Sequence, residues 1–171
     1  MAQKLSATLE NYLEAIFRLE QKKRFARVRD ISAALSVAKS AVTTALQSLS
    51  EKGLVNYEPY EPVTLSPEGR QRAERIVVCH RVIEDFLRKV LALEAERAEA
   101  IACKMEHAID RDALERFVCF LAFVGRRRKA GESWLDEFRS FIEQGAGGQT
   151  CQECIEEYLR TVTTDAGCEA A

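Results

Sequence analysis

The position of the prolines limits the fold of this chain more than any other feature of its sequence. All three, Pro59, Pro62 and Pro67, lie within nine residues of a 171-residue chain. Because proline interrupts helices, long helices are expected on both sides of this segment. Apolar residues recur there at three- and four-residue spacings. They predict helices over residues 6–21, 28–35, 39–52, 66–91, 95–108, 111–124, 132–143 and 151–162.

Two short strands, residues 54–57 and 63–65, are predicted after the third helix, joined by a turn that contains prolines. Two helices separated by a tight turn, at 28–35 and 39–52, and then a β-hairpin form the pattern of a winged helix-turn-helix. The outer face of helix 39–52 carries small hydroxyl side chains, which suit close approach to base edges and phosphates. This pattern favours DNA binding. The alternative is a small helical domain whose hairpin binds another protein.

The net charge of −2 gives the chain no general positive field for nucleic acid. The charge is unevenly divided, because residues 1–65 carry nine Lys and Arg against seven Asp and Glu, whereas the remainder carries 16 against 20. No apolar run approaches the roughly 20 residues that span a bilayer, and the N-terminus lacks a signal-peptide core. We therefore expect a cytoplasmic protein with no membrane partner, whose six cysteines are thiols or metal ligands rather than disulfides.

Candidate metal ligands are concentrated in predicted helix 95–108. Four of them follow at spacings of four, three and one and would share one helical face: Glu99, Cys103, Glu106 and His107. This mixture of carboxylate, thiolate and imidazole suits Fe²⁺, Mn²⁺, Co²⁺ or Zn²⁺ better than Ca²⁺ or Mg²⁺. His80 and Glu84 form a second pair, four residues apart on the preceding helix. The alternative is ordinary structure, with Glu99 a solvated helix residue and the cysteines small core residues.

These motifs, in this order, resemble the iron- and manganese-dependent repressors of the diphtheria toxin repressor type, the DtxR/MntR family. The resemblance runs from about Leu5 to Val124. In the first half it covers Asn11-Tyr12-Leu13-Glu14-Ala15-Ile16, Val28-x-Asp30-Ile31-Ser32-x-x-Leu35, Val42-Thr43 and Glu51-Lys52-Gly53-Leu54-Val55 with Tyr57-Glu58-Pro59-Tyr60. It continues through Leu65-Ser66-Pro67-Glu68-Gly69, His80-x-x-x-Glu84-x-Phe86-Leu87 and Cys103-x-x-Glu106-His107.

The resemblance implies a set of metal ligands by position. The primary site of the iron-type members corresponds to Asn11, Cys103, Glu106 and His107. The ancillary site corresponds to His80, Glu84 and Glu99, and in the manganese-type members Glu14 and His80 join the cluster. Asn11 departs from both types, which carry methionine or aspartate there. Cys103 favours Fe²⁺ over Mn²⁺, because thiolate suits iron better and the manganese type has a carboxylate at that place.

The resemblance also implies which residues face DNA. The start of the recognition helix and the residues before it would meet the bases and their flanking phosphates: Ala38, Lys39, Ser40, Thr43 and Thr44. Tyr57 and Tyr60 of the wing would hydrogen-bond phosphates, and Arg27, Arg29 and Lys39 would supply positive charge.

The expected architecture is mostly α, with a winged helix-turn-helix domain over 1–66, a helical metal-binding and dimerisation domain over 67–144, and a short helical extension over 145–171. The function predicted is a homodimeric, metal-dependent repressor that binds palindromic operators and is not an enzyme. In the extension, Cys151, Cys154 and Cys168 are candidates for a second metal or redox site. The alternative function is therefore a redox or iron–sulfur sensor that binds DNA through the same domain.

Overall fold

The computed structural model describes residues 5–23, 25–129, 131, 133–144, 153, 155 and 156 of the chain. Its helices are α1 (Ala7–Lys23), α2 (Val28–Leu35), α3 (Lys39–Glu51), α4 (Pro67–Lys89), α5 (Ala95–Met105), α6 (Arg111–Lys129) and α7 (Trp134–Gln144), and its strands are β1 (Val55–Asn56) and β2 (Thr64–Leu65). The predicted helices up to residue 143 are confirmed, and so is the mostly helical fold. The helix predicted at 151–162 lies largely outside the described residues.

Helices α1, α2 and α3 and the hairpin form the N-terminal domain around one apolar core. The core is fully buried at Leu13, Ile31, Leu46 and Leu49. Antiparallel β1 and β2 pair Val55 with Leu65 and Asn56 with Thr64, which makes the wing shorter than the sequence predicts. The arrangement is a winged helix-turn-helix.

A buried glutamate of this domain joins α1 to the wing and to the start of α4. Glu20, near the end of α1, has a side chain only 4% exposed and pairs with Arg70 at the start of α4. Its other carboxylate oxygen accepts a hydrogen bond from the backbone N–H of Leu65 in β2, at 2.7 Å. Because a buried carboxylate needs such partners, this contact fixes α1, the wing and α4 to one another.

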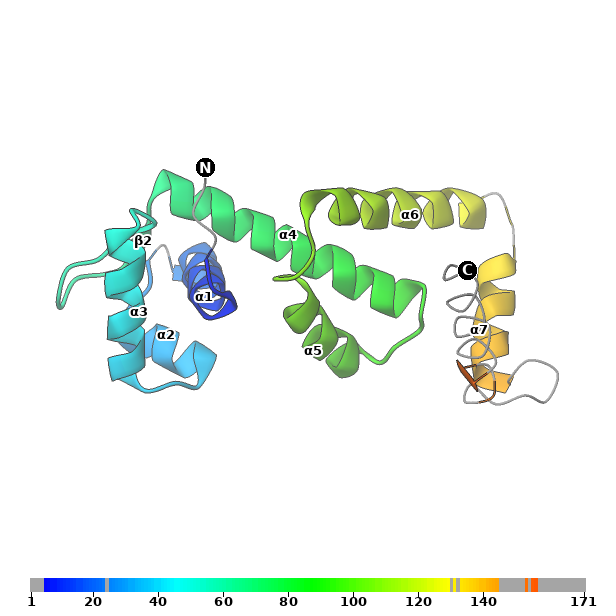
Figure 1. Ribbon diagram of the computed structural model, residues 1–171, viewed down its shortest axis with the longest axis horizontal. Coiled ribbons are helices and arrows are strands. Elements are labelled where there is room, and N and C mark those ends of the chain that lie inside the picture. Colours follow the sequence, from blue (N-terminus) through cyan, green and yellow to red (C-terminus); the bar gives the residue numbers. More distant parts are fainter. Residues whose placement is uncertain are drawn as a thin grey trace, which may run out of the picture.

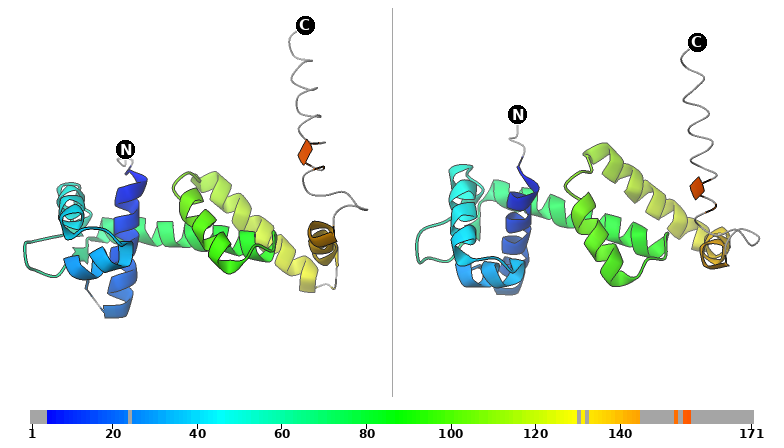
Figure 2. Two further views of the ribbon diagram at one scale, coloured as in Figure 1. Left: turned by 90° about the horizontal axis from the view of Figure 1, so that it is seen from below. Right: turned by 60° about the horizontal axis from the view of Figure 1, so that its bottom comes forward.

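Helix α4 is the axis of the molecule. Figures 1 and 2 show it running along the long dimension, with the winged domain at one end and α7 at the other. It begins with Ser66 as N-cap, whose hydroxyl accepts from the N–H of Gly69, and with proline in the first turn. Helix α1 crosses its first half, whereas α5 and α6 pack on its second half. One helix thus carries both the DNA-binding domain and the helical domain.

Two helix ends in the second domain differ from those predicted from the sequence. Helix α5 ends at Met105, so Glu106 and His107 lie in the following turn and not on the helix predicted to reach 108. Helix α6 continues to Lys129 and includes the basic run that begins at Arg126, beyond the predicted end at 124. Within the described residues, none of the helices is both long and apolar enough to cross a membrane.

Alanine substitutions at Gly69 and Gly125 test how tightly the backbone before the wing packs on α4. A Cβ built on Gly69 would lie 1.8 Å from the carbonyl oxygen of Leu54, whereas one on Gly125 would meet nothing within 4 Å. We expect Gly69→Ala to lower the free energy of unfolding by at least about 2 kcal/mol, because backbone must shift to admit the methyl group. Gly125→Ala, the matched control in another helix, should raise it by about 0.5–1 kcal/mol. Urea unfolding of both variants measures this, and equal effects would contradict the packing.

Candidate metal centre and DNA-binding surface

Three buried side chains from three elements meet between the two domains. They are Glu14 of α1, His80 of α4 and Glu106 of the turn after α5, and one ligand atom from each lies within 4.8 Å of the other two. The Nδ1 atom of His80 is 2.6 Å from Oε2 of Glu106. Two carboxylates and an imidazole at this separation are donors suited to a divalent transition metal.

Glu106 is the most constrained member of the group. Its side chain is fully buried, and its Oε1 atom has no hydrogen-bond partner among the described residues. Burial, and then the negative charge of Glu14, raise the pKa of this carboxyl, although the hydrogen bond from His80 acts in the opposite direction. A buried carboxylate oxygen without a donor is costly. A cation placed beside Glu106 would satisfy its unpartnered oxygen and offset the negative charge of Glu14, so these residues fit a metal.

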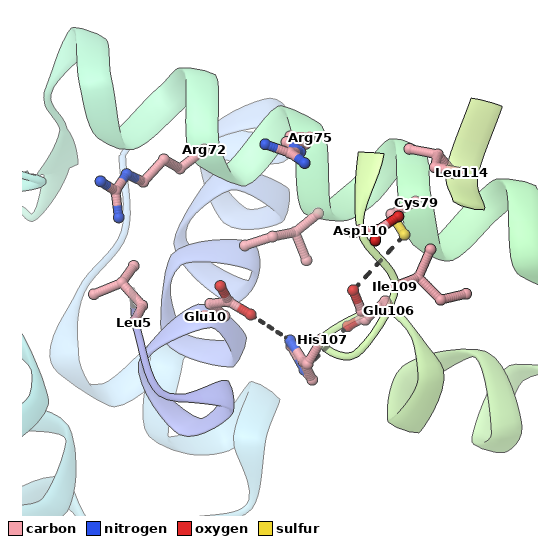
Figure 3. Close-up of a pocket in the computed structure, with 11 residues that line it drawn as sticks. Leu5, Glu10, Arg72, Arg75, Cys79, Glu106, His107, Ile109, Asp110 and Leu114 are labelled. Atoms are coloured by element: carbon pink, nitrogen blue, oxygen red, sulfur yellow. Dashed lines mark hydrogen bonds and ion pairs between the residues drawn. The ribbon is translucent and has the colours of Figure 1, made fainter. Parts of the chain in front are cut away.

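His107 follows directly and contacts α1 on both sides of its ring. Figure 3 shows Glu10 and His107 facing each other, with Nδ1 2.6 Å from Oε2 of Glu10. Nε2 lies 2.8 Å from Oδ1 of Asn11 and 3.4 Å from Oε1 of Glu106. A neutral imidazole donates from one nitrogen only. With Glu10 accepting from Nδ1–H, the lone pair of Nε2 faces the oxygens of Asn11 and Glu106, which is the arrangement of a metal-binding histidine with a carboxylate behind it.

Cys103 and Glu99 do not join this buried group. Both are exposed on α5 and line an open groove of about 540 Å³ together with Asn11, Glu14 and His80. The expectation that Glu99, Cys103, Glu106 and His107 share one helical face is therefore wrong, because α5 ends before Glu106 and the turn carries the last two residues inward. Partial desolvation, followed by the charges of Glu106 and Glu14, raises the pKa of the Cys103 thiol.

The predicted ancillary residues border a second groove of about 660 Å³, lined by His80, Glu84 and Glu99. Glu84 pairs there with Arg88 on the next turn of α4, at 3.1 Å. His80 lies at the boundary of the two grooves. The structure thus brings the ancillary residues to one groove and leaves only His80 in contact with the buried group.

Sequence reasoning missed two residues of this region, Glu10 and Arg18. Glu10 contacts His107, as described above, and Arg18 pairs with Glu14 through Nη2 and Oε1 at 2.7 Å. Their spacing was the available signal. Glu10, Glu14 and Arg18 follow at intervals of four on α1, so they lie on the same side of that helix as the ligand candidates.

The residues expected to face DNA lie at the start of α3 and beside it. Ala38, Lys39, Ser40 and Thr44 are exposed, and Thr43 is half-buried. The hydroxyls of the two threonines donate to the carbonyls of Lys39 and Ser40, each at 3.1 Å. Each hydroxyl oxygen keeps lone pairs that can accept a hydrogen bond, and that of the exposed Thr44 is open to a DNA partner.

Charged and aromatic side chains flank this helix. Arg27 and Arg29 are exposed, and the guanidinium of Arg27 lies over the ring of Phe25 at 5.3 Å. In the wing, Tyr60 is fully exposed and has a positive φ of 72°, whereas Tyr57 is half-buried and packs against the domain core. Tyr60 is therefore the better placed of the two tyrosines for a phosphate.

Two protein-family models match most of the chain. Residues 4–63 match the N-terminal DNA-binding domain of the iron-dependent repressors, and residues 66–135 match their metal-binding and dimerisation domain. The chain belongs to this family. The resemblance to the DtxR/MntR repressors is thereby confirmed. The iron-dependent repressor family consists of transcriptional regulators, so the expectation that the protein is not an enzyme agrees with it.

Two relatives from this family illustrate the match. A helix-turn-helix type transcriptional regulator of Methanocaldococcus jannaschii is 36% identical over 118 residues, which cover 68% of this chain and 94% of the relative. The transcriptional regulator MntR of Lysinibacillus sphaericus is 36% identical over 109 residues, covering 64% and 78%.

Solved structures of the same family share the fold. The crystal structure of IdeR from T. acidophilum aligns with a TM-score of 0.60 and 26% identity over 66% of this chain. A manganese-dependent transcriptional repressor in complex with manganese aligns with a TM-score of 0.62 and 26% identity over 67%. In both cases the match spans 53% of the solved chain.

Replacing Glu106 should separate stability from metal binding. Glu106→Gln removes a buried charge that faces Glu14, so we expect the metal-free protein to unfold at a higher temperature than the wild type. The same variant loses a charged donor and should bind Mn²⁺ more than about 100-fold more weakly. Thermal unfolding in chelator and an anaerobic metal titration measure the two effects. Glu115→Gln, at an exposed glutamate of α6, is the control. A Glu106→Gln variant that keeps wild-type affinity would contradict the site.

Proposed function

We propose that this protein is a homodimeric, metal-dependent transcriptional repressor that binds palindromic operators of metal-homeostasis genes. The observation that carries the proposal is the position of the buried donors. Glu14, with Asn11 beside it, belongs to a helix of the DNA-binding domain, whereas His80, Glu106 and His107 belong to the helical domain. A cation held by both sets ties the two domains together.

The residues around the site explain how a cation that links the two domains would control DNA binding. Without a cation, Glu106 keeps an unpartnered oxygen beside the negative charge of Glu14. A neutral His107 donates a hydrogen bond to Glu10 and has no proton left to donate to Asn11. The metal would supply positive charge between the carboxylates. Fixing α1 then fixes α3, because both helices share one core. Coupling of this kind between two sites amounts to about 1–3 kcal/mol and is reciprocal.

Dimerisation explains how a change at the metal site would alter binding to an operator with two half-sites. Val78 of α4 and Val118, Phe120 and Phe123 of α6 are large apolar residues that remain 38–54% exposed. We assign these residues to the dimer interface, since the family's second domain is named for dimerisation. Two recognition helices held by a dimer would match half-sites about 34 Å apart, one turn of DNA. A regulator of this kind acts at the chromosome, which makes a cytoplasmic location part of the proposal.

Manganese is the first candidate metal. The buried group contains carboxylates and imidazole only, which suit Mn²⁺, and relatives are named MntR. Iron is the second candidate because Cys103 lines the adjoining groove, and its thiolate would favour Fe²⁺. The redox alternative rests on Cys151, Cys154 and Cys168, which lie outside the described residues, and the family assignment gives it no support.

The proposal is tested by fluorescence anisotropy of the protein on DNA from upstream of its own gene, under anaerobic conditions. We expect tight binding with Mn²⁺ or Fe²⁺ and weak binding in chelator, with the more effective metal deciding between the two candidates. His107→Ala should abolish the response to metal and leave the fold intact. Lys104→Ala, at an exposed position of the same region, should respond as the wild type does. Tight binding that metal leaves unchanged would contradict the proposed function.

A further inference from the structure

Arg18 is the cation nearest to the buried group. Its Nη2 atom lies 2.7 Å from Oε1 of Glu14, one helical turn earlier on α1. The Glu14 side chain is 11% exposed, whereas that of Arg18 is 50% exposed. Within the part of the chain that the structure describes, this largely buried carboxylate thus has one guanidinium partner, and that partner is half in solvent.

The same arginine lies where the two grooves meet. The residues that line both of them are Arg18, Lys22, His80 and Glu99, and of the two cations only Arg18 has an ion pair with Glu14 among the described residues. It therefore stands beside the carboxylate that a metal would need, and it also faces the carboxylates of the second groove. Glu99 has no ion pair in the part of the chain that the structure describes.

We propose that Arg18 is a resident cation that neutralises Glu14 in the metal-free protein and opposes metal entry, and that it thereby sets the metal concentration at which the protein responds. This inference rests on the proposed function and adds a regulatory element to the same site. On metal binding, Glu14 exchanges its guanidinium partner for the metal, and Arg18 turns toward Glu99 in the second groove.

The physical basis is competition for one carboxylate. A guanidinium and a divalent ion that share Glu14 are separated by only a few ångströms, where the repulsion between like charges is modest in bulk water but larger beside a protein surface. Because half of the Arg18 side chain is in solvent, it moves away at little cost. The exchange therefore opposes metal binding without preventing it.

Arg18→Met removes the charge and keeps a side chain of similar length. We expect this variant to bind Mn²⁺ at least about tenfold more tightly than the wild type, because the competing charge is gone. Its metal-free form should unfold at a lower temperature, because Glu14 loses its counter-ion. Arg18→Lys keeps the charge and should bind metal with nearly wild-type affinity. Arg111→Met breaks an exposed pair with Glu115 on α6, of the same spacing, and is the control.

The measurement is an anaerobic titration with Mn²⁺ against a fluorescent chelator, together with thermal unfolding in excess chelator. Tighter binding by Arg18→Met alone supports the inference. Equal or weaker binding by Arg18→Met, in a background where the wild type binds metal, overturns the inference and leaves the proposed function standing. A wild-type chain that binds neither Mn²⁺ nor Fe²⁺ overturns both.

Discussion

The contact between α1 and the turn after α5 is the interaction on which the rest of this structure depends. Helix α1 is part of the winged domain, and the turn that carries Glu106 and His107 is part of the helical domain. Between them lie a pair of buried carboxylates, two imidazoles and an amide, without enough donors to satisfy every oxygen. A polar joint of this kind is weak when empty and strong when a cation fills it. Because this site lies between the two domains, a cation bound there would affect the position of the DNA-binding domain.

The wing and the long helix make that control possible. Glu20 ties α1 to β2 and to the start of α4, so the winged domain moves as one unit. The backbone of Leu54 lies so close to Gly69 that α4 and the wing cannot separate without a large rearrangement. What remains adjustable is the junction further along α4, where His80 projects toward α1. These contacts therefore stabilise the winged domain. The response to metal is concentrated at the junction, where the metal-free protein contains a buried, unpartnered carboxylate oxygen that lowers its stability.

The fold was largely predictable from the sequence, because helical periodicity and the confined prolines define the elements. The site was predictable in its residue types but not in its arrangement. Glu99 and Cys103 follow the spacing of a helical face with Glu106 and His107, yet α5 ends at Met105, and the end of a helix is poorly determined by local sequence. Glu10 and Arg18 could not be predicted as site residues, because their roles depend on groups that only the tertiary structure brings near them. Arg18 has its partner one turn away, but the grooves that it lines also include residues of α4 and α5, which are far away in the sequence.

The measurement that tests the central claim most directly is hydrogen exchange of the intact chain, followed peptide by peptide in chelator and in Mn²⁺. If a cation ties the two domains together, exchange should slow in α1 and in residues 105–109 at the same time, while the amides of α6 change little. Slowing confined to residues 105–109, with α1 unaffected, would show that metal binds without joining the domains. That result would contradict the account, because control of the recognition helix would then have no route through α1.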